Sequence, residues 1–133
     1  MLTAVAGGTW EPPPRVLVCD DEPYIVRLIQ ANFEQFGCKV FTTYNGIEGL
    51  NVARREKPDL VVLDSMMPFM DGLEVIRALR SDPELKETPI VLLSAKAQDK
   101  DVFEAYHNGA DIYLTKPFNP LELTSILRGL GRR

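Results

Sequence analysis

A chain of 133 residues with a formal net charge of -4 has the size of one domain. Its 15 basic residues are outnumbered by 19 acidic ones and form no basic stripe, so we expect no direct contact with nucleic acid. Residues 1–8 lack the features of a signal peptide, and no apolar run approaches the ~20 residues of a membrane span. Cys19 and Cys38 lie in or beside apolar runs without metal or redox spacing. These features favour a cytoplasmic protein that does not contact a membrane.

Residues 1–14 contain Gly7-Gly8 and then three consecutive prolines, which remove backbone donors and favour an extended path. We interpret this segment as an extended tail or linker and residues 15–131 as the folded domain. From Arg15 onward, short apolar runs alternate with longer segments of helical period. That alternation predicts a parallel sheet with helices on both faces.

Five short runs predict the strands of this sheet. Unbroken apolar runs at 16–19, 60–63 and 90–93 are typical of inner strands that are covered on both faces. The runs at 39–43 and 111–115 mix polar and apolar residues and predict less covered edge strands.

Helical segments separate these runs. The first begins after Pro23 and stops at Gly37, which is the usual placement of proline and glycine at helix ends. Four more helices are expected, at 47–55, 72–80, 100–108 and 120–130. The predicted fold class is therefore α/β: a doubly wound, five-stranded parallel sheet of flavodoxin-like order 2-1-3-4-5. With no second domain expected, any output would come from another protein, unless the chain is part of a longer one.

Polar residues stand where the predicted strands end, which is where open parallel sheets bind ligands. They are Asp20 and Asp21, Asp64, Ser94 and Lys116. Taken singly, each could cap a helix, start a turn or be an ordinary solvated lysine. In the order 2-1-3-4-5, however, the first and third strands are neighbours, so the three aspartates share one crevice. Three carboxylates repel each other without a counter-ion, and oxygen ligands suit Mg²⁺ or Mn²⁺.

At these residues the chain resembles the receiver domain of bacterial two-component response regulators, in its single-domain, chemotaxis-regulator-like form. The resemblance covers residues 15–130. It rests on four motifs in order: Asp20-Asp21, the segment from Asp64 to Gly72, Ser94-Ala95-Lys96, and the segment from Tyr113 to Phe118.

The resemblance implies that Asp64 is the phosphoacceptor. It also implies a magnesium site in which Asp21 and Asp64 bind the ion directly, Asp20 acts through water, and Met66 adds its backbone carbonyl. The domain would catalyse only its own phosphorylation and dephosphorylation, so it is not expected to be an enzyme for an outside substrate.

For the phosphoryl group, the resemblance implies contacts from Ser94 and Lys116, with a cis bond between Lys116 and Pro117. Ser94 would then move, and Tyr113 would turn inward as the second switch residue. The alternative is that Tyr113 is an edge-strand aromatic that never moves. The moving face would comprise helix 100–108, strand 111–115 and helix 120–130.

The resemblance also implies partners. The phosphoryl donor would be a phosphohistidine on a sensor histidine kinase or histidine phosphotransfer protein, and the switched face would bind a downstream effector or form a homodimer. Two other classes are alternatives: a receiver fold that docks a partner without phosphorylation, and a small phosphatase or flavin carrier on a similar sheet. The acidic cluster disfavours the first, and the absence of a glycine-rich phosphate cradle disfavours the second.

Overall fold

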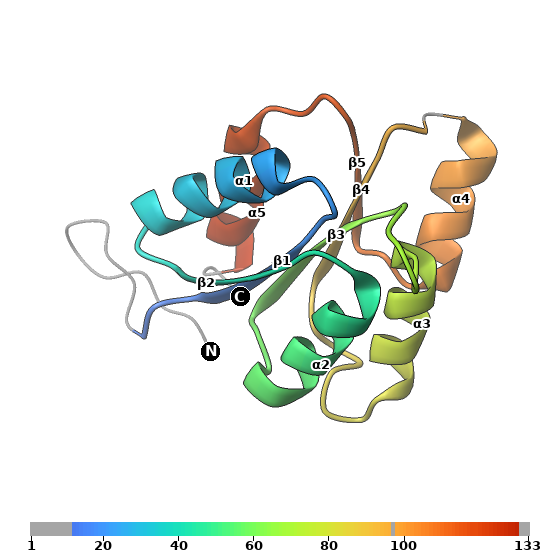
Figure 1. Ribbon diagram of the computed structural model, residues 1–133, viewed down its shortest axis with the longest axis horizontal. Helices are drawn as coiled ribbons and strands as arrows, with labels where there is room; N and C mark the ends of the chain where they lie inside the picture. Colours follow the sequence, from blue (N-terminus) through green and yellow to red (C-terminus); the bar gives the residue numbers. More distant parts are fainter. Residues whose placement is uncertain (1–11, 97, 131–133) are drawn as a thin grey trace.

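The computed structural model describes residues 12–96 and 98–130 and places them in a single sheet flanked by helices (Figure 1). The sheet order is β2-β1-β3-β4-β5, and all neighbouring pairs are parallel. The expected fold class and strand order are thus confirmed. The strands are β1 (Arg15–Cys19), β2 (Lys39–Thr43), β3 (Leu60–Asp64), β4 (Ile90–Ser94) and β5 (Ile112–Thr115).

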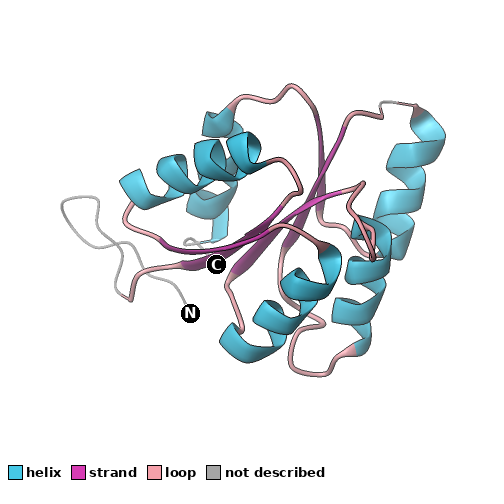
Figure 2. Ribbon diagram, in the orientation of Figure 1, coloured by secondary structure: helices cyan, strands magenta, loops and turns pink. Residues whose placement is uncertain are grey.

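Helices cover both faces of the sheet, as Figures 1 and 2 show. Two of them, α1 (Pro23–Gln35) and α5 (Pro120–Leu130), lie together on one face. The opposite face carries α2 (Gly46–Glu56), α3 (Gly72–Ser81) and α4 (Asp99–Asn108).

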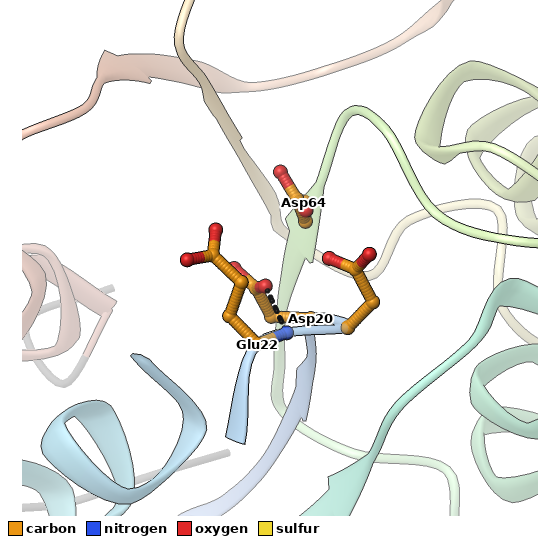
Figure 3. A group of neighbouring side chains, drawn as sticks. Asp20, Glu22 and Asp64 are labelled. Atoms are coloured by element: carbon orange, nitrogen blue, oxygen red, sulfur yellow. Dashed lines mark hydrogen bonds between the residues drawn. The ribbon is translucent and has the colours of Figure 1, made fainter. Parts of the chain in front are cut away.

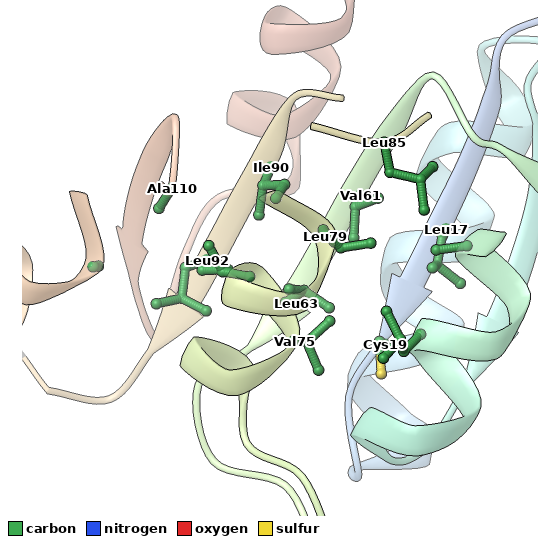
Figure 4. Close-up of a cluster of buried hydrophobic side chains, with 14 residues drawn as sticks. Leu17, Cys19, Val61, Leu63, Val75, Leu79, Leu85, Ile90, Leu92 and Ala110 are labelled. Carbon is green, nitrogen blue, oxygen red and sulfur yellow. The ribbon is translucent and has the colours of Figure 1, made fainter. Parts of the chain in front are cut away.

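The strand alternation divides the interior into two cores. In β1, Val16 and Val18 face the α1/α5 side, whereas Leu17 and Cys19 face the other side (Figure 4). Every residue of β3 and β4 is buried, while β2 and β5 are partly exposed. The inner and edge strands are therefore those that the sequence predicts.

Side chains and glycines at the helix ends explain where the helices begin and stop. Asn45 accepts a hydrogen bond from the backbone of Glu48 and starts α2 one residue earlier than expected. Asp71 and Glu74 form a reciprocal capping box at the start of α3. Gly37, with φ of 85°, follows the end of α1 in a conformation that glycine adopts without a steric penalty.

The predicted strand at 111–115 begins one residue late, at Ile112. Asp111 instead turns its carboxylate to the backbone N–H of Ile90 at 2.7 Å and to the guanidinium of Arg80 at 2.8 Å. It thereby ties the start of β4 to the end of α3.

Most of the proposed tail, residues 1–11, lies outside the described residues, as does Gly131 at the proposed end of the domain. Of the described tail residues, Pro14 is buried, and its carbonyl accepts a hydrogen bond from Lys39 at 2.8 Å. The limits of the domain stay a prediction. Within the described part of the chain, each helix is too short or too polar to cross a bilayer.

Candidate functional site

An acidic cluster lies where β1 and β3 end side by side. Asp20 directly follows β1 and is fully buried, and Asp64 is the last residue of β3 and is 5% exposed. With Asp21 and Glu22 they bring four carboxylates together, each with an oxygen within 4.8 Å of the others (Figure 3). The backbone N–H of Glu22 donates to Asp20 at 2.9 Å and fixes that carboxylate in place.

Lys116 joins this cluster from the end of β5. Its ammonium nitrogen lies 3.0 Å from Asp20, 3.2 Å from Asp64 and 3.3 Å from Glu22. Its backbone N–H donates to the carbonyl of Ser94 at 2.8 Å, and its bond to Pro117 is cis, as the resemblance implies. Three carboxylates therefore share the single ammonium group of Lys116.

The electrostatics of the cluster favour an additional cation. Burial, followed by the charge of Asp20, raises the pKa of Asp64 to about 7, and Lys116 offsets only part of this. Burial also raises the pKa of Asp20 above its ordinary value. Burial would by itself lower the pKa of Lys116, but bonds and charges from Asp20 and Asp64 outweigh it and raise that pKa. A compact set of carboxylate oxygens with too few positive charges fits a hard divalent ion such as Mg²⁺.

Ser94 ends β4 and is 1% exposed, although it carries a hydroxyl. Its Oγ accepts the backbone N–H of Lys96 at 3.1 Å and the hydroxyl of Ser65 at 2.9 Å. Beside it opens a cavity of about 520 Å³. The residues lining this cavity include Asp21, Ser65, Met66, Asp71, Ser94, Lys96 and Tyr113.

Tyr113 lines the same cavity from β5 and is half-buried. Its hydroxyl donates a hydrogen bond to the carbonyl of Lys96, in the segment that follows β4. Its backbone N–H donates to the hydroxyl of Tyr106 on α4 at 3.1 Å. Tyr113 and Ser94 thus share one cavity, and the inward turn of Tyr113 stays a prediction.

Two glycines at the starts of helices allow close packing around β3 and the loop that follows it: Gly72 lies against Asp64 and Gly46 against Met70. A Cβ on Gly72 would lie 2.5 Å from the carbonyl oxygen of Asp64, and one on Gly46 would lie 2.0 Å from that of Met70. Both contacts are with backbone, so a side chain at either position would force the backbone to shift. Met66, by contrast, is 64% exposed in this loop, and its role as a carbonyl ligand stays a prediction.

The structure adds two residues that the sequence interpretation did not include. Glu22 belongs to the acidic cluster and contacts Lys116, and its position in the acidic run after β1 was the available signal. Ser65 contacts Ser94, and no pattern in the sequence indicates that pairing.

The family model of the response regulator receiver domain matches residues 16–128 of this chain. The alkaline phosphatase synthesis transcriptional regulatory protein PhoP of Bacillus subtilis is 44% identical over 119 residues, which are 90% of this chain and 49% of that protein. The chain spans about half the length of the curated relatives that it matches.

Two solved structures have a similar fold over nearly their whole length. The chemotaxis response regulator CheY4 of Vibrio cholerae has a TM-score of 0.83 and 31% identity, over 89% of this chain and 98% of that one. The receiver domain of the sensor histidine kinase PA1611 of Pseudomonas aeruginosa has a TM-score of 0.83 and 28% identity, and the match covers 91% of this chain and 99% of that one. That structure contains a magnesium ion in its active-site cleft.

Proposed function

Because the chain belongs to the response regulator receiver domain family, we propose that it switches when Asp64 accepts a phosphoryl group. Members of this family are phosphorylation-dependent signalling switches and not classical enzymes. One observation carries the assignment to Asp64. Its carboxylate is the one that ends an inner strand, lies 3.2 Å from the ammonium of Lys116 and belongs to the acidic cluster.

The proposed reaction needs mainly alignment and charge neutralisation, because phosphoryl transfer passes through a loose transition state. An ionised oxygen of Asp64 forms a bond to phosphorus while the bond from phosphorus to the donor's histidine nitrogen breaks. The ammonium of Lys116 exchanges one of its carboxylate partners for a phosphoryl oxygen. The hydroxyl of Ser94 donates a hydrogen bond to a second phosphoryl oxygen. Water later hydrolyses the acyl phosphate on Asp64.

We assign the magnesium site to Asp20, Asp21 and Asp64, with the carbonyl of Met66 as a further ligand and Mn²⁺ as an alternative ion. Glu22 contributes negative charge at the rim, since its side chain is 60% exposed. When bound, the ion neutralises negative charge on the phosphoryl oxygens.

For partners, we propose a sensor histidine kinase or histidine phosphotransfer protein as donor and an effector protein that reads the face of α4, β5 and α5. Phe103 on α4 and Leu121 on α5 are large apolar side chains that are 71% and 61% exposed. If the face forms a homodimer on phosphorylation, light scattering will show a mass increase with an acyl-phosphate mimic. An unchanged mass would exclude dimerisation.

The expectation that the protein makes no direct contact with nucleic acid is not confirmed. It rests on the charge of this chain, whereas PhoP, of which the chain matches half, is named as a transcriptional regulator.

The decisive experiment is intact-mass analysis after incubation with acetyl phosphate and Mg²⁺. We expect one phosphoryl group, labile to hydroxylamine, on the wild-type protein. Asp64→Asn and a chelated sample should gain none. A stable phosphoryl group, or one that persists in Asp64→Asn, would refute the assignment of Asp64.

A further inference from the structure

A pair of hydroxyls connects the ends of β3 and β4 beside the acidic cluster. Ser65 directly follows Asp64, and its Oγ donates a hydrogen bond to Ser94 at 2.9 Å across 29 residues of sequence. Strand pairing does not require a hydroxyl at position 65, because the sheet is held by backbone groups. The bond nevertheless links the neighbour of the proposed phosphoacceptor to the proposed phosphoryl contact.

The backbone of Ser65 is held on both sides. Its N–H donates to the carbonyl of Leu93 on β4 at 2.8 Å, and its own carbonyl accepts the N–H of Gly72 at the start of α3, at 3.0 Å. Its Cα would also lie 3.0 Å from a Cβ on Gly72, so α3 packs directly against it. The backbone that carries the hydroxyl of Ser65 is therefore tied both to β4 and to the start of α3.

The hydroxyl of Ser94 is already fully used as an acceptor. It receives hydrogen bonds from Ser65 and from the backbone N–H of Lys96, which together occupy both of its lone pairs. A phosphoryl group on Asp64 would attract the O–H of Ser94. When Oγ moves toward that group, it leaves both donors, and the half-buried hydroxyl of Ser65 loses its partner.

We propose that Ser65 is a positioning residue that holds Ser94 in its resting position and so opposes the switched state. The inference rests on the proposed function of Asp64 and Ser94. The net contribution of one neutral hydrogen bond corresponds to roughly a two- to tenfold change in an equilibrium constant. Ser65 therefore sets how strongly a given phosphoryl group moves Ser94.

The test measures the affinity of the full chain for beryllofluoride, a phosphoryl mimic, at saturating Mg²⁺. We expect Ser65→Ala to bind the mimic roughly two- to tenfold more tightly than wild type. Ser65→Thr, which restores the hydroxyl, should return the affinity to within about twofold of wild type. Ser81→Ala is the matched control, because among the described residues the hydroxyl of Ser81 bonds only the carbonyl of Arg77 on α3. The affinity of these three variants for Mg²⁺ in the absence of beryllofluoride should equal that of wild type. An unchanged Mg²⁺ affinity distinguishes an effect on the position of Ser94 from a general effect on the acidic cluster.

A second arm places Ser65→Ala in a Ser94→Ala background, where we expect it to have no effect on the affinity. Unchanged or weaker binding by Ser65→Ala alone, or tighter binding that persists without Ser94, would overturn the inference. A wild-type protein that binds no beryllofluoride at all would overturn the proposed function and this inference with it.

Discussion

Replacing Asp64 with asparagine keeps the size of the side chain and removes one buried negative charge. The pKa of Asp64 is about 7 in the folded protein, against an ordinary value of 3.8. Since each unit of difference is equivalent to about 1.4 kcal/mol, ionised Asp64 costs the folded state up to ~4 kcal/mol at pH 8. We therefore expect Asp64→Asn to be more stable than wild type at pH 8 when no metal is present.

The direction of the pKa shift of Asp64 determines how the stability of the protein depends on pH. Because the folded pKa lies above the unfolded one, the proton stabilises the folded state. This contribution is fully present below about pH 4 and is lost as the pH rises through about 7. Between pH 5 and pH 8 the metal-free wild type should thus lose up to ~3 kcal/mol relative to Asp64→Asn.

Urea unfolding in chelator at a series of pH values measures this difference. Glu87→Gln is the control, since Glu87 is exposed, and its replacement should leave the pH dependence unchanged. Mg²⁺ at about 100 times its dissociation constant should stabilise wild type by ~2.7 kcal/mol and Asp64→Asn by much less. A stability difference that stays constant from pH 5 to pH 8 would refute the argument, because Asp64 would then titrate as an ordinary solvated carboxyl.

Three further predictions follow from the site. Lys116→Met removes the ammonium that three carboxylates share and should cost about 3 kcal/mol at pH 8, and less at pH 5, by urea unfolding; an equal loss at both pH values would contradict this. Gly72→Ala should cost about 1–3 kcal/mol because its Cβ meets the backbone of Asp64, whereas Gly129→Ala, with open space around it, should not destabilise; equal stabilities of the two variants would exclude the clash. Met66→Asn should speed loss of the phosphoryl group, because an amide beside Asp64 can hold water that methionine cannot; unchanged decay of the labelled protein would defeat this prediction.

Much of the fold could be predicted because its signals are local. Proline and glycine delimit α1, and the inner strands are unbroken apolar runs, so their limits differ by at most one residue from those expected. Where α2 and β5 begin one residue away from their predicted starts, a polar side chain explains the difference. Asn45 extends α2 by capping it, and Asp111 leaves the strand pattern by bonding Ile90 and Arg80.

The proximity of the polar residues that follow the strands could also be predicted, because the carboxyl ends of parallel strands must meet at one edge of the sheet. Asp20, Asp64 and Lys116 are in contact for that reason. Their roles in phosphorylation stay predictions. Glu22 was missed because an exposed acidic residue after a strand looks like an ordinary solvated charge.

The sequence by itself determined the alternation of strands and helices and which polar residues follow each strand, since both depend on residues close together in the chain. Only the tertiary structure decided which of those groups touch. Lys116 contacts Asp20 across 96 residues of sequence, and Ser65 contacts Ser94 across 29. Burial of Asp64 in the folded chain raises its pKa to about 7. These properties depend on strand order, side-chain direction and exclusion of water, which arise only when distant segments pack together.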